Sequence, residues 1–320
     1  MSTEQLEMFP EGQPGRGSLG EFGPPVAQSV PVMRATSLAA ALGPFQDYMI
    51  RQGFTENTIK AFLSDLRLLG RYVDARTPVG QIGTKRLNDF LTWMLHQRGV
   101  PCSPKTYARR VTTLKVFFGW LNENQVLPVD PAAPVVQQSV SAPLAEILYE
   151  DQVEKVLEVT RGLLEAEKPD ARPHLLVSLL LQTGVKKGEC MKVELRHIDT
   201  SDPQNATLFI RYDSPRYQHK ERKLRLPTDW VPVYQQYRAQ YQPQTRLFEC
   251  TARNLEYVLH DVAQRAGLPT LSFEMLRWTS AVRDYEAGMD GDKLRQKMGL
   301  SKISWQETSQ KLAKLAGPGL

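Results

Sequence analysis

Basic side chains in the first half of the sequence recur at intervals that bring them to one helix face. Lys60, Arg67 and Arg71 are separated by seven and then four residues, so a helix would present them together. Lysine and arginine neutralise DNA phosphates and release the counterions bound to them. This face therefore predicts contact with a nucleic-acid backbone. A solvated helix face that binds nothing is an equally weighted alternative.

A second basic face is predicted about forty residues further on. Lys105 and Arg109 are four residues apart, and Thr106, Arg110 and Thr113 lie close to them in the sequence. We expect this face to point away from the apolar stripe of the same helix. Two basic helix faces in one domain predict a grip on opposite sides of a DNA duplex.

The distribution of charge favours the same segment. The net charge is +5, and residues 36–132 carry twelve basic against seven acidic residues, whereas residues 1–35 carry two against four. The positive excess therefore sits in the first folded segment, as expected if that segment meets a polyanion. A solvated surface remains the simpler explanation of so modest an excess.

Composition limits the class of protein. With 41% hydrophobic and 23% charged residues in 320, the chain has an ordinary globular composition and room for two domains. No apolar run approaches the length of a membrane span, so no membrane partner is expected. Cys102, Cys190 and Cys250 are far apart, which argues against a disulfide framework and a metal site. We expect a cytoplasmic protein, associated with the nucleoid, that needs no cofactor.

The elements that must position these residues divide into four segments. Residues 1–36 are rich in Gly and Pro and predict a disordered arm, in which Met8, Phe9 and Pro10 form a weaker candidate for a docking peptide. Residues 37–128 predict a four-helix domain, with Thr55 and Ser103 as N-caps. Residues 129–147 contain several prolines and predict a linker.

Residues 148–320 predict a second domain that is mostly helical with a small antiparallel sheet. Two short strands are expected, joined by a polar turn, at residues 207–212 and 222–226. Apolar periodicity predicts eight helices, at residues 149–166, 173–182, 187–195, 230–241, 252–266, 273–287, 291–299 and 302–315. The predicted fold class of the whole chain is therefore mainly α.

Several motifs resemble those of the tyrosine recombinase (phage integrase) family. Residues 55–72 and 103–132 are similar to helices of the family's core-binding domain. In the second domain three segments are similar to the family's T-G-L-R-x-S-E box, K-G-x-K-E-R-x-V-P-L hairpin and L-R-H … E-A-G-V-D … L-G-H box, and they are residues 183–189, 219–227 and 276–300. The resemblance covers residues 37–312. It implies an N-terminal SAM-like core-binding domain followed by a domain with the recombinase catalytic fold.

The resemblance also implies a chemistry. In the family a tyrosine attacks a DNA phosphodiester without a metal, and arginines and histidines hold the phosphate oxygens as negative charge builds up. A lysine on the hairpin protonates the leaving hydroxyl. Each of these roles requires one kind of side chain.

Most of these positions are occupied by other residues in this sequence. The second arginine is present as Arg277, with a structural ion pair as its alternative role, and the first is replaced by Lys186, which lacks the planar fork of arginine. The hairpin lysine aligns with Tyr217, although Arg216 or Lys220 could substitute for it. The two histidines and the nucleophilic tyrosine correspond to Glu274, Leu300 and Ser309.

These replacements predict a protein that binds specific sites in double-stranded DNA and does not cleave them. Residues 286–320 contain no tyrosine, and Tyr285 lies at a position that the family does not use for attack. We expect an accessory, regulatory or architectural factor of a mobile element, with Lys186, Lys220, Arg222 and Arg277 on DNA in the second domain.

Two alternatives remain open. In the first, the chain forms a homo-oligomer on DNA, or a complex with an active recombinase through its C-terminal helix, and the partner supplies the nucleophile. In the second, the chain is a scaffold that has lost its affinity for DNA. Two structural roles are also expected. Trp278 packs in the core, and Glu274 forms an ion pair with Lys186 in the pocket that the family's catalytic residues would occupy.

Overall fold

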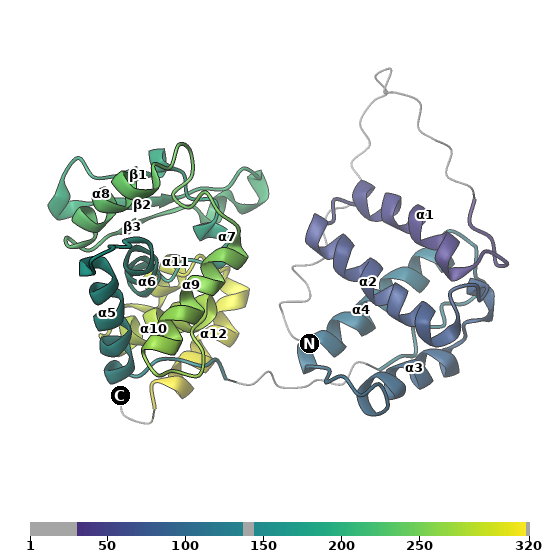
Figure 1. Ribbon diagram of the computed structural model, residues 1–320. Coiled ribbons are helices and arrows are strands. Elements are labelled where there is room, and N and C mark those ends of the chain that lie inside the picture. The colour runs from purple at the N-terminus through teal and green to yellow at the C-terminus, as the bar shows by residue number, and fades with distance from the viewer. Residues whose placement is uncertain (1–30, 137–143, 318–320) are drawn as a thin grey trace, which may run out of the picture. The chain divides into compact units, whose positions relative to one another are not determined.

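The computed structural model describes residues 31–136 and 144–317 of the chain (Figure 1). Its contacts separate into two compact units, Met1–Ala142 and Pro143–Leu320. Most of the predicted arm, including Met8, Phe9 and Pro10, and the centre of the predicted linker lie outside the described residues.

The N-terminal unit contains the four predicted helices, α1 (Leu38–Arg51), α2 (Glu56–Val73), α3 (Thr84–His96) and α4 (Pro104–Glu123). The side chains of Ser37, Thr55 and Ser103 cap α1, α2 and α4 by accepting hydrogen bonds from backbone N–H groups of the first turn. These caps fix where the helices begin, and the apolar stripes then pack on one another.

Aromatic rings form the centre of the N-terminal core. The ring of Phe45 on α1 lies 5.0 Å from that of Phe117 and 5.3 Å from that of Trp120, both on α4. The segment that follows α4 also contributes, since Ala132 and Val135 are fully buried and the Thr84 hydroxyl donates to the Pro131 carbonyl at 2.8 Å. Residues up to Val135 therefore belong to this unit's packing.

A buried carboxylate joins α2 to α4. Asp65 accepts hydrogen bonds from Arg109 at 2.5 Å, from Arg110 at 3.3 Å and from the Thr113 hydroxyl at 3.0 Å. Only 12% of the Arg110 side chain and 30% of the Arg109 side chain are exposed. The expectation that these arginines and Thr113 point away from the apolar face is therefore wrong. The charge of Asp65, placed among the apolar residues of α2, draws both guanidinium groups inward.

The C-terminal unit is built on two central helices, α6 (Arg172–Thr183) and α10 (Phe273–Glu286), which pack against each other. α5 (Glu150–Glu165), α8 (Trp230–Tyr241) and α9 (Ala252–Arg265) pack on α6. The core between them is large and apolar and includes Leu175, Trp230 and Leu276. Figure 1 shows the sheet and α8 together at one end of this unit.

The sheet has three antiparallel strands, β1 (Ile198–Asp199), β2 (Thr207–Ile210) and β3 (Arg222–Arg225), in that order. In the register, Leu208 pairs with Leu224 and Ile210 with Arg222. β1 was not predicted, because two residues are too few for an alternating pattern. The predicted polar turn between β2 and β3 contains a 3-10 helix, Pro215–Lys220.

One predicted helix is much shorter than expected. The helix expected at residues 187–195 is α7 (Lys187–Cys190), with four residues. Beyond it a turn leads to an isolated antiparallel bridge between Glu194 and Arg246, where the Leu247 N–H donates to the Val193 carbonyl at 2.8 Å and the Leu195 N–H to the Thr245 carbonyl at 2.9 Å. These long-range hydrogen bonds use the backbone groups that a longer helix would need.

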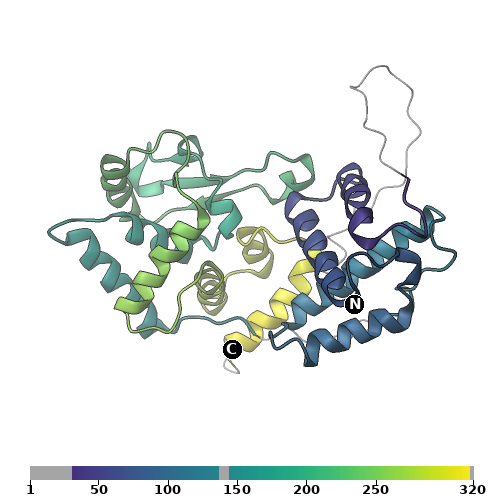
Figure 2. The ribbon, with the colours of Figure 1, turned by 45° about the vertical axis from the view of Figure 1, so that its right-hand side comes forward.

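The unit ends in a small helical layer. α11 (Gly291–Lys297) and α12 (Lys302–Leu315) pack on α10, as Figure 2 shows from a second direction. Trp278 is 9% exposed and packs with Leu294, Met298 and Leu312, so the expectation that it serves the core is confirmed. Among the described residues, no helix is both long and apolar enough to cross a membrane.

The Asp65 network yields a stability prediction. Asp65→Ala leaves two partly buried guanidinium groups without their carboxylate, and such a loss costs about 3 kcal/mol. We expect the free energy of unfolding of the N-terminal unit to fall by that amount in urea denaturation. Asp89→Ala on the exposed face of α3 is the matched control, expected to change it by less than about 0.5 kcal/mol. Equal losses in the two variants would contradict the role of Asp65.

Candidate phosphate-binding site

Four basic side chains converge around one carboxylate in the C-terminal unit. They are Lys186, Lys220, Arg222 and Arg277, here called the basic cluster, and the carboxylate is Glu189. They come from the start of α7, from the segment between β2 and β3, from β3 and from α10. The structure thus brings together all four C-terminal residues that the sequence predicted to contact DNA.

Glu189 is the centre of a hydrogen-bond network. Its two carboxylate oxygens accept from the Arg222 guanidinium at 3.0 and 2.9 Å, and the Lys186 backbone N–H donates to it at 2.8 Å. The Tyr212 hydroxyl is a further donor to Glu189. Burial alone would raise the pKa of Glu189, but the Arg222 charge and these hydrogen bonds outweigh it and lower the pKa to about 2. Glu189 is therefore ionised at neutral pH.

Arg222 is held in place by every nitrogen of its guanidinium. Besides its bidentate pair with Glu189, it donates from Nε to the Lys297 carbonyl at 2.7 Å and from a terminal nitrogen to the Lys220 carbonyl at 3.1 Å. Its side chain is 7% exposed. Gly299 leaves the necessary space, because a Cβ there would lie 2.6 Å from an Arg222 nitrogen and the backbone φ of +61° favours glycine.

Arg277 is 5% exposed and donates to two backbone carbonyls, those of Gly184 and, at 2.7 Å, Met298. Neither carbonyl carries a full charge, and none of the described carboxylates forms an ion pair with this side chain. The structural ion pair that was an alternative for Arg277 is therefore not present among these residues. Arginine stays protonated even when buried, so its positive charge persists in the cluster.

Lys186 is the member of the cluster whose charge can change. Its ammonium donates to the Gly299 carbonyl at 3.3 Å. Burial, together with the positive charges of Arg277, Lys220 and Arg222, outweighs the attraction of Glu189 and lowers the pKa of Lys186 to about 8. The protonation state of this lysine therefore varies close to neutral pH.

The other positions named from the resemblance lie apart or have other partners. Glu274 accepts a hydrogen bond from the Trp278 indole at 2.8 Å, and no ion pair with Lys186 is found among the described residues, so that expectation is wrong. Leu300 packs in the small apolar cluster around Trp278. The Ser309 hydroxyl on α12 donates to the Gln306 carbonyl at 3.1 Å. The Tyr217 ring lies 5.3 Å from the Lys220 ammonium and 5.9 Å from the Tyr212 ring.

In the N-terminal unit, the basic residues of α2 are open to solvent. Arg67 and Arg71 are exposed, and Lys60 is exposed and paired with Glu56 one turn earlier. Lys105 is also exposed, whereas Thr106 takes part in the cap of α4 and accepts a hydrogen bond from the Ser103 hydroxyl. The exposed face of α2 thus stays a candidate for DNA contact, while Arg109 and Arg110 are occupied by Asp65.

Glu189, Tyr212 and Gly299 were not singled out as site residues from the sequence. Glu189 could have been found, because a glutamate at the third position of a helix commonly accepts a hydrogen bond from the backbone N–H of the N-cap residue. Tyr212 and Gly299 act through contacts between segments distant in sequence, which local patterns do not reveal. The described residues contain no group of three or more His, Cys, Asp or Glu side chains arranged to hold a metal ion.

Comparison with known proteins agrees with this architecture. Residues 42–126 match the family model described as phage integrase, N-terminal SAM-like domain. The tyrosine recombinase XerC of Mycobacterium sp. (strain JLS) is 28% identical over 166 residues, which are 51% of this chain and 55% of that protein. The match therefore spans only about half the length of this curated relative.

Two solved structures share the fold. A lambda integrase dimer bound to a COC′ core site has a TM-score of 0.67 at 14% identity. The match covers 89% of this chain and 79% of the integrase chain. The XerH site-specific recombinase bound to difH substrate, in a pre-cleavage complex, has a TM-score of 0.62 at 16% identity, covering 86% and 81%. The mainly helical fold with a SAM-like N-terminal domain and a catalytic-fold domain is thereby confirmed.

The Glu189 network yields a pH prediction. Because the pKa of Glu189 is lowered from 4.5 to about 2, its contribution to stability is complete above pH 4.5 and is lost as the pH falls towards 2. A shift of this size corresponds to about 3 kcal/mol. We expect Glu189→Gln to lower the free energy of unfolding of the C-terminal unit by that amount at pH 7 and by progressively less below pH 4.5.

Urea denaturation at a series of pH values measures this difference. Glu256→Gln is the control. Glu256, on α9, is an exposed carboxylate that pairs with Lys187, and Lys187 lies on α7, the helix that carries Glu189. A gap between wild type and Glu189→Gln that stays constant down to pH 2 would show that Glu189 is not the titrating group.

Proposed function

Starting from the tyrosine recombinase/phage integrase family, to which this chain belongs, we propose that it binds specific sites in double-stranded DNA without cleaving them. In this proposal the basic cluster holds one backbone phosphate, and the exposed face of α2 contacts further phosphates. The protein then acts at the nucleoid as an accessory, regulatory or architectural factor. The solved relatives on DNA support binding of this kind.

The charge balance of the basic cluster carries the proposal. Four cationic side chains lie around Glu189, and Glu274 is also near Arg277, so the two carboxylates offset only part of the positive charge. Buried charge without a counter-charge is costly, and an anion in the site relieves it. Arg222 is already neutralised by Glu189, which leaves Lys186, Lys220 and Arg277 to hold a phosphate oxygen.

The side chains at the positions that correspond to the family's catalytic residues support the proposed absence of cleavage. Ser309 occupies the position that corresponds to the nucleophile, and its hydroxyl donates to a backbone carbonyl of its own helix. A nucleophile of this kind needs a neighbouring base or a lowered pKa. Glu274 and Leu300 offer no hydrogen-bond donor to a phosphate oxygen, so the charge that develops during cleavage would not be stabilised.

A trapped-complex experiment tests the absence of cleavage. DNA sites are first selected from a random library by binding to the purified chain, and nicked suicide substrates are then made from them. We expect a mobility shift without a covalent protein–DNA adduct, for the native chain and for Ser309→Tyr alone. An adduct formed by the native chain, mapped to Ser309 or Tyr217, would overturn the proposal.

The same experiment addresses the second candidate function, a subunit that binds DNA while an active recombinase provides the nucleophile. The dimer that lambda integrase forms on its core site motivates it. An adduct that appears only after an active recombinase is added, and that contains the recombinase and not this chain, would favour the subunit role.

Lys186 makes DNA binding sensitive to pH. Its pKa of about 8 means that it is protonated below pH 8 and loses its charge above it, and a bound phosphate favours the protonated form. We expect the affinity for a selected DNA site to fall by up to about tenfold per pH unit above pH 8. Lys186→Arg should abolish this dependence, because arginine remains charged.

The affinity is measured by fluorescence anisotropy at constant ionic strength. Lys187→Arg is the matched control, since Lys187 is the next residue, is half exposed and pairs with Glu256. It should leave the pH dependence as it is in the native chain. The same pH dependence in Lys186→Arg would show that this lysine does not contact the phosphate.

A further inference from the structure

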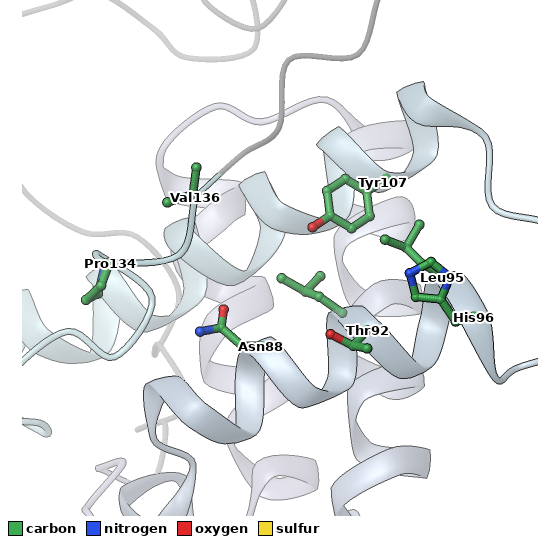
Figure 3. Close-up of a pocket in the computed structure, with 8 residues that line it drawn as sticks. Asn88, Thr92, Leu95, His96, Tyr107, Pro134 and Val136 are labelled. Carbon is green, nitrogen blue, oxygen red and sulfur yellow. The ribbon is translucent and has the colours of Figure 1, made fainter.

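The N-terminal unit has an open groove that the proposed function does not use. It has a volume of about 350 Å³ and lies between α3, α4 and the segment after α4. Figure 3 shows Asn88, Thr92, Leu95 and His96 along α3, with Tyr107 from α4 on the other side and Pro134 and Val136 at one end. A groove of this size is in the range of sites that accept ligand-sized apolar groups, roughly 300–1,000 Å³.

The groove has a mixed lining, in which Asn88, Thr92 and His96 are polar and the other lining residues contribute apolar surface. Leu91 and Tyr107 are buried beneath it, whereas Leu95 is 41% and Val136 75% exposed. These two large aliphatic side chains, towards opposite ends of the groove in Figure 3, leave apolar surface in water that a partner could cover. The position of Val136 is fixed by the buried Val135 beside it. The groove is therefore framed by packed elements.

The first residues of the sequence match this groove in chemistry. Residues 4–11 read Glu-Gln-Leu-Glu-Met-Phe-Pro-Glu, and they combine three large apolar side chains with three carboxylates and no basic residue. α3 and the loop after it carry three basic residues against one acidic residue, namely Lys85, Arg86 and Arg98 against Asp89. Lys85 precedes Asn88 by three residues and so shares its helix face.

The length of the intervening chain allows the contact within one molecule. Twenty-one residues separate Phe9 from Pro31, and such a stretch spans up to about 70 Å when extended. A unit of about 100 residues has a radius of gyration of only about 13 Å, so every point of its surface is within reach. Tethering of this kind gives effective concentrations on the order of 1 mM, at which a short motif suffices for docking.

We propose that residues 4–11 of this chain dock in the groove between α3 and α4 of the same molecule. Met8 and Phe9 enter between Leu95, Tyr107 and Val136, and the glutamates on either side lie towards the basic residues of α3. The docked segment would then cover the exposed rim of the groove. This inference does not depend on the proposed DNA-binding function.

Hydrogen exchange on the full-length chain tests the docking. Met8→Ser combined with Phe9→Ser should increase the exchange rate of the α3 amides from Asn88 to His96 about five- to tenfold, because the groove is uncovered. The matched control is Leu19→Ser combined with Phe22→Ser, which makes the same kind of change in the same arm outside the motif. We expect no change in exchange for the control. Equal exchange in the native chain and in the first variant would overturn the proposal.

Two further measurements separate the possible occupants. A synthetic peptide of residues 1–14, added in excess to the Met8→Ser/Phe9→Ser chain, should restore the slow exchange. Leu95→Glu, at an exposed position, should raise exchange alone and add nothing to the arm variant. If dilution by about tenfold removes the protection in the native chain, the occupant is the arm of a second copy, and docking within one molecule is refuted.

Discussion

The buried ion pair between Glu189 and Arg222 is the constraint on which the C-terminal site depends. Through Glu189 the pair fixes the start of α7 by the Lys186 backbone, and it also fixes Tyr212 just beyond β2. Through Arg222 it ties β3 to the end of α11 at the Lys297 carbonyl. The sheet, α7 and α11 thus meet at one ion pair, and Lys186 and Lys220 flank elements that it joins.

In both units a buried carboxylate binds arginine side chains, but the two arrangements differ in the positive charge that they leave. In the N-terminal unit Asp65 draws Arg109 and Arg110 into the core, where their hydrogen bonds join α2 to α4. In the C-terminal unit Glu189 neutralises one arginine and leaves three cations beside it. The one carboxylate among two arginines in the N-terminal unit leaves a small excess of positive charge, whereas the two arginines and two lysines around Glu189 leave a larger excess, which on our proposal favours a bound anion.

Much of the fold could be predicted from the sequence, because apolar periodicity and caps mark long helices in local patterns. α7 could not, because the chain after it is fixed by hydrogen bonds to Thr245 and Leu247, about fifty residues away. Arg109 and Arg110 were misplaced for a similar reason. Their partner Asp65 lies on the apolar stripe of α2, and a charge on such a stripe was the available signal for a buried partner. The resemblance identified Lys186 and Arg277 as candidate site residues. It did not identify Trp278 as the hydrogen-bond partner of Glu274, because that contact depends on how the side chains pack.

The replacements in the basic cluster change what the site stabilises. Interactions that hold a phosphate equally well before and during reaction contribute affinity without rate, whereas catalysis needs groups that act on the charge of the transition state. Arg277 is already held by two carbonyls, and Lys186 offers a point charge in place of a fork. On our proposal this arrangement binds the ground-state phosphate and lacks the groups that would act during cleavage. On the same proposal, Ser309 at the position of the nucleophile accompanies a site whose side chains bind a phosphate without cleaving it.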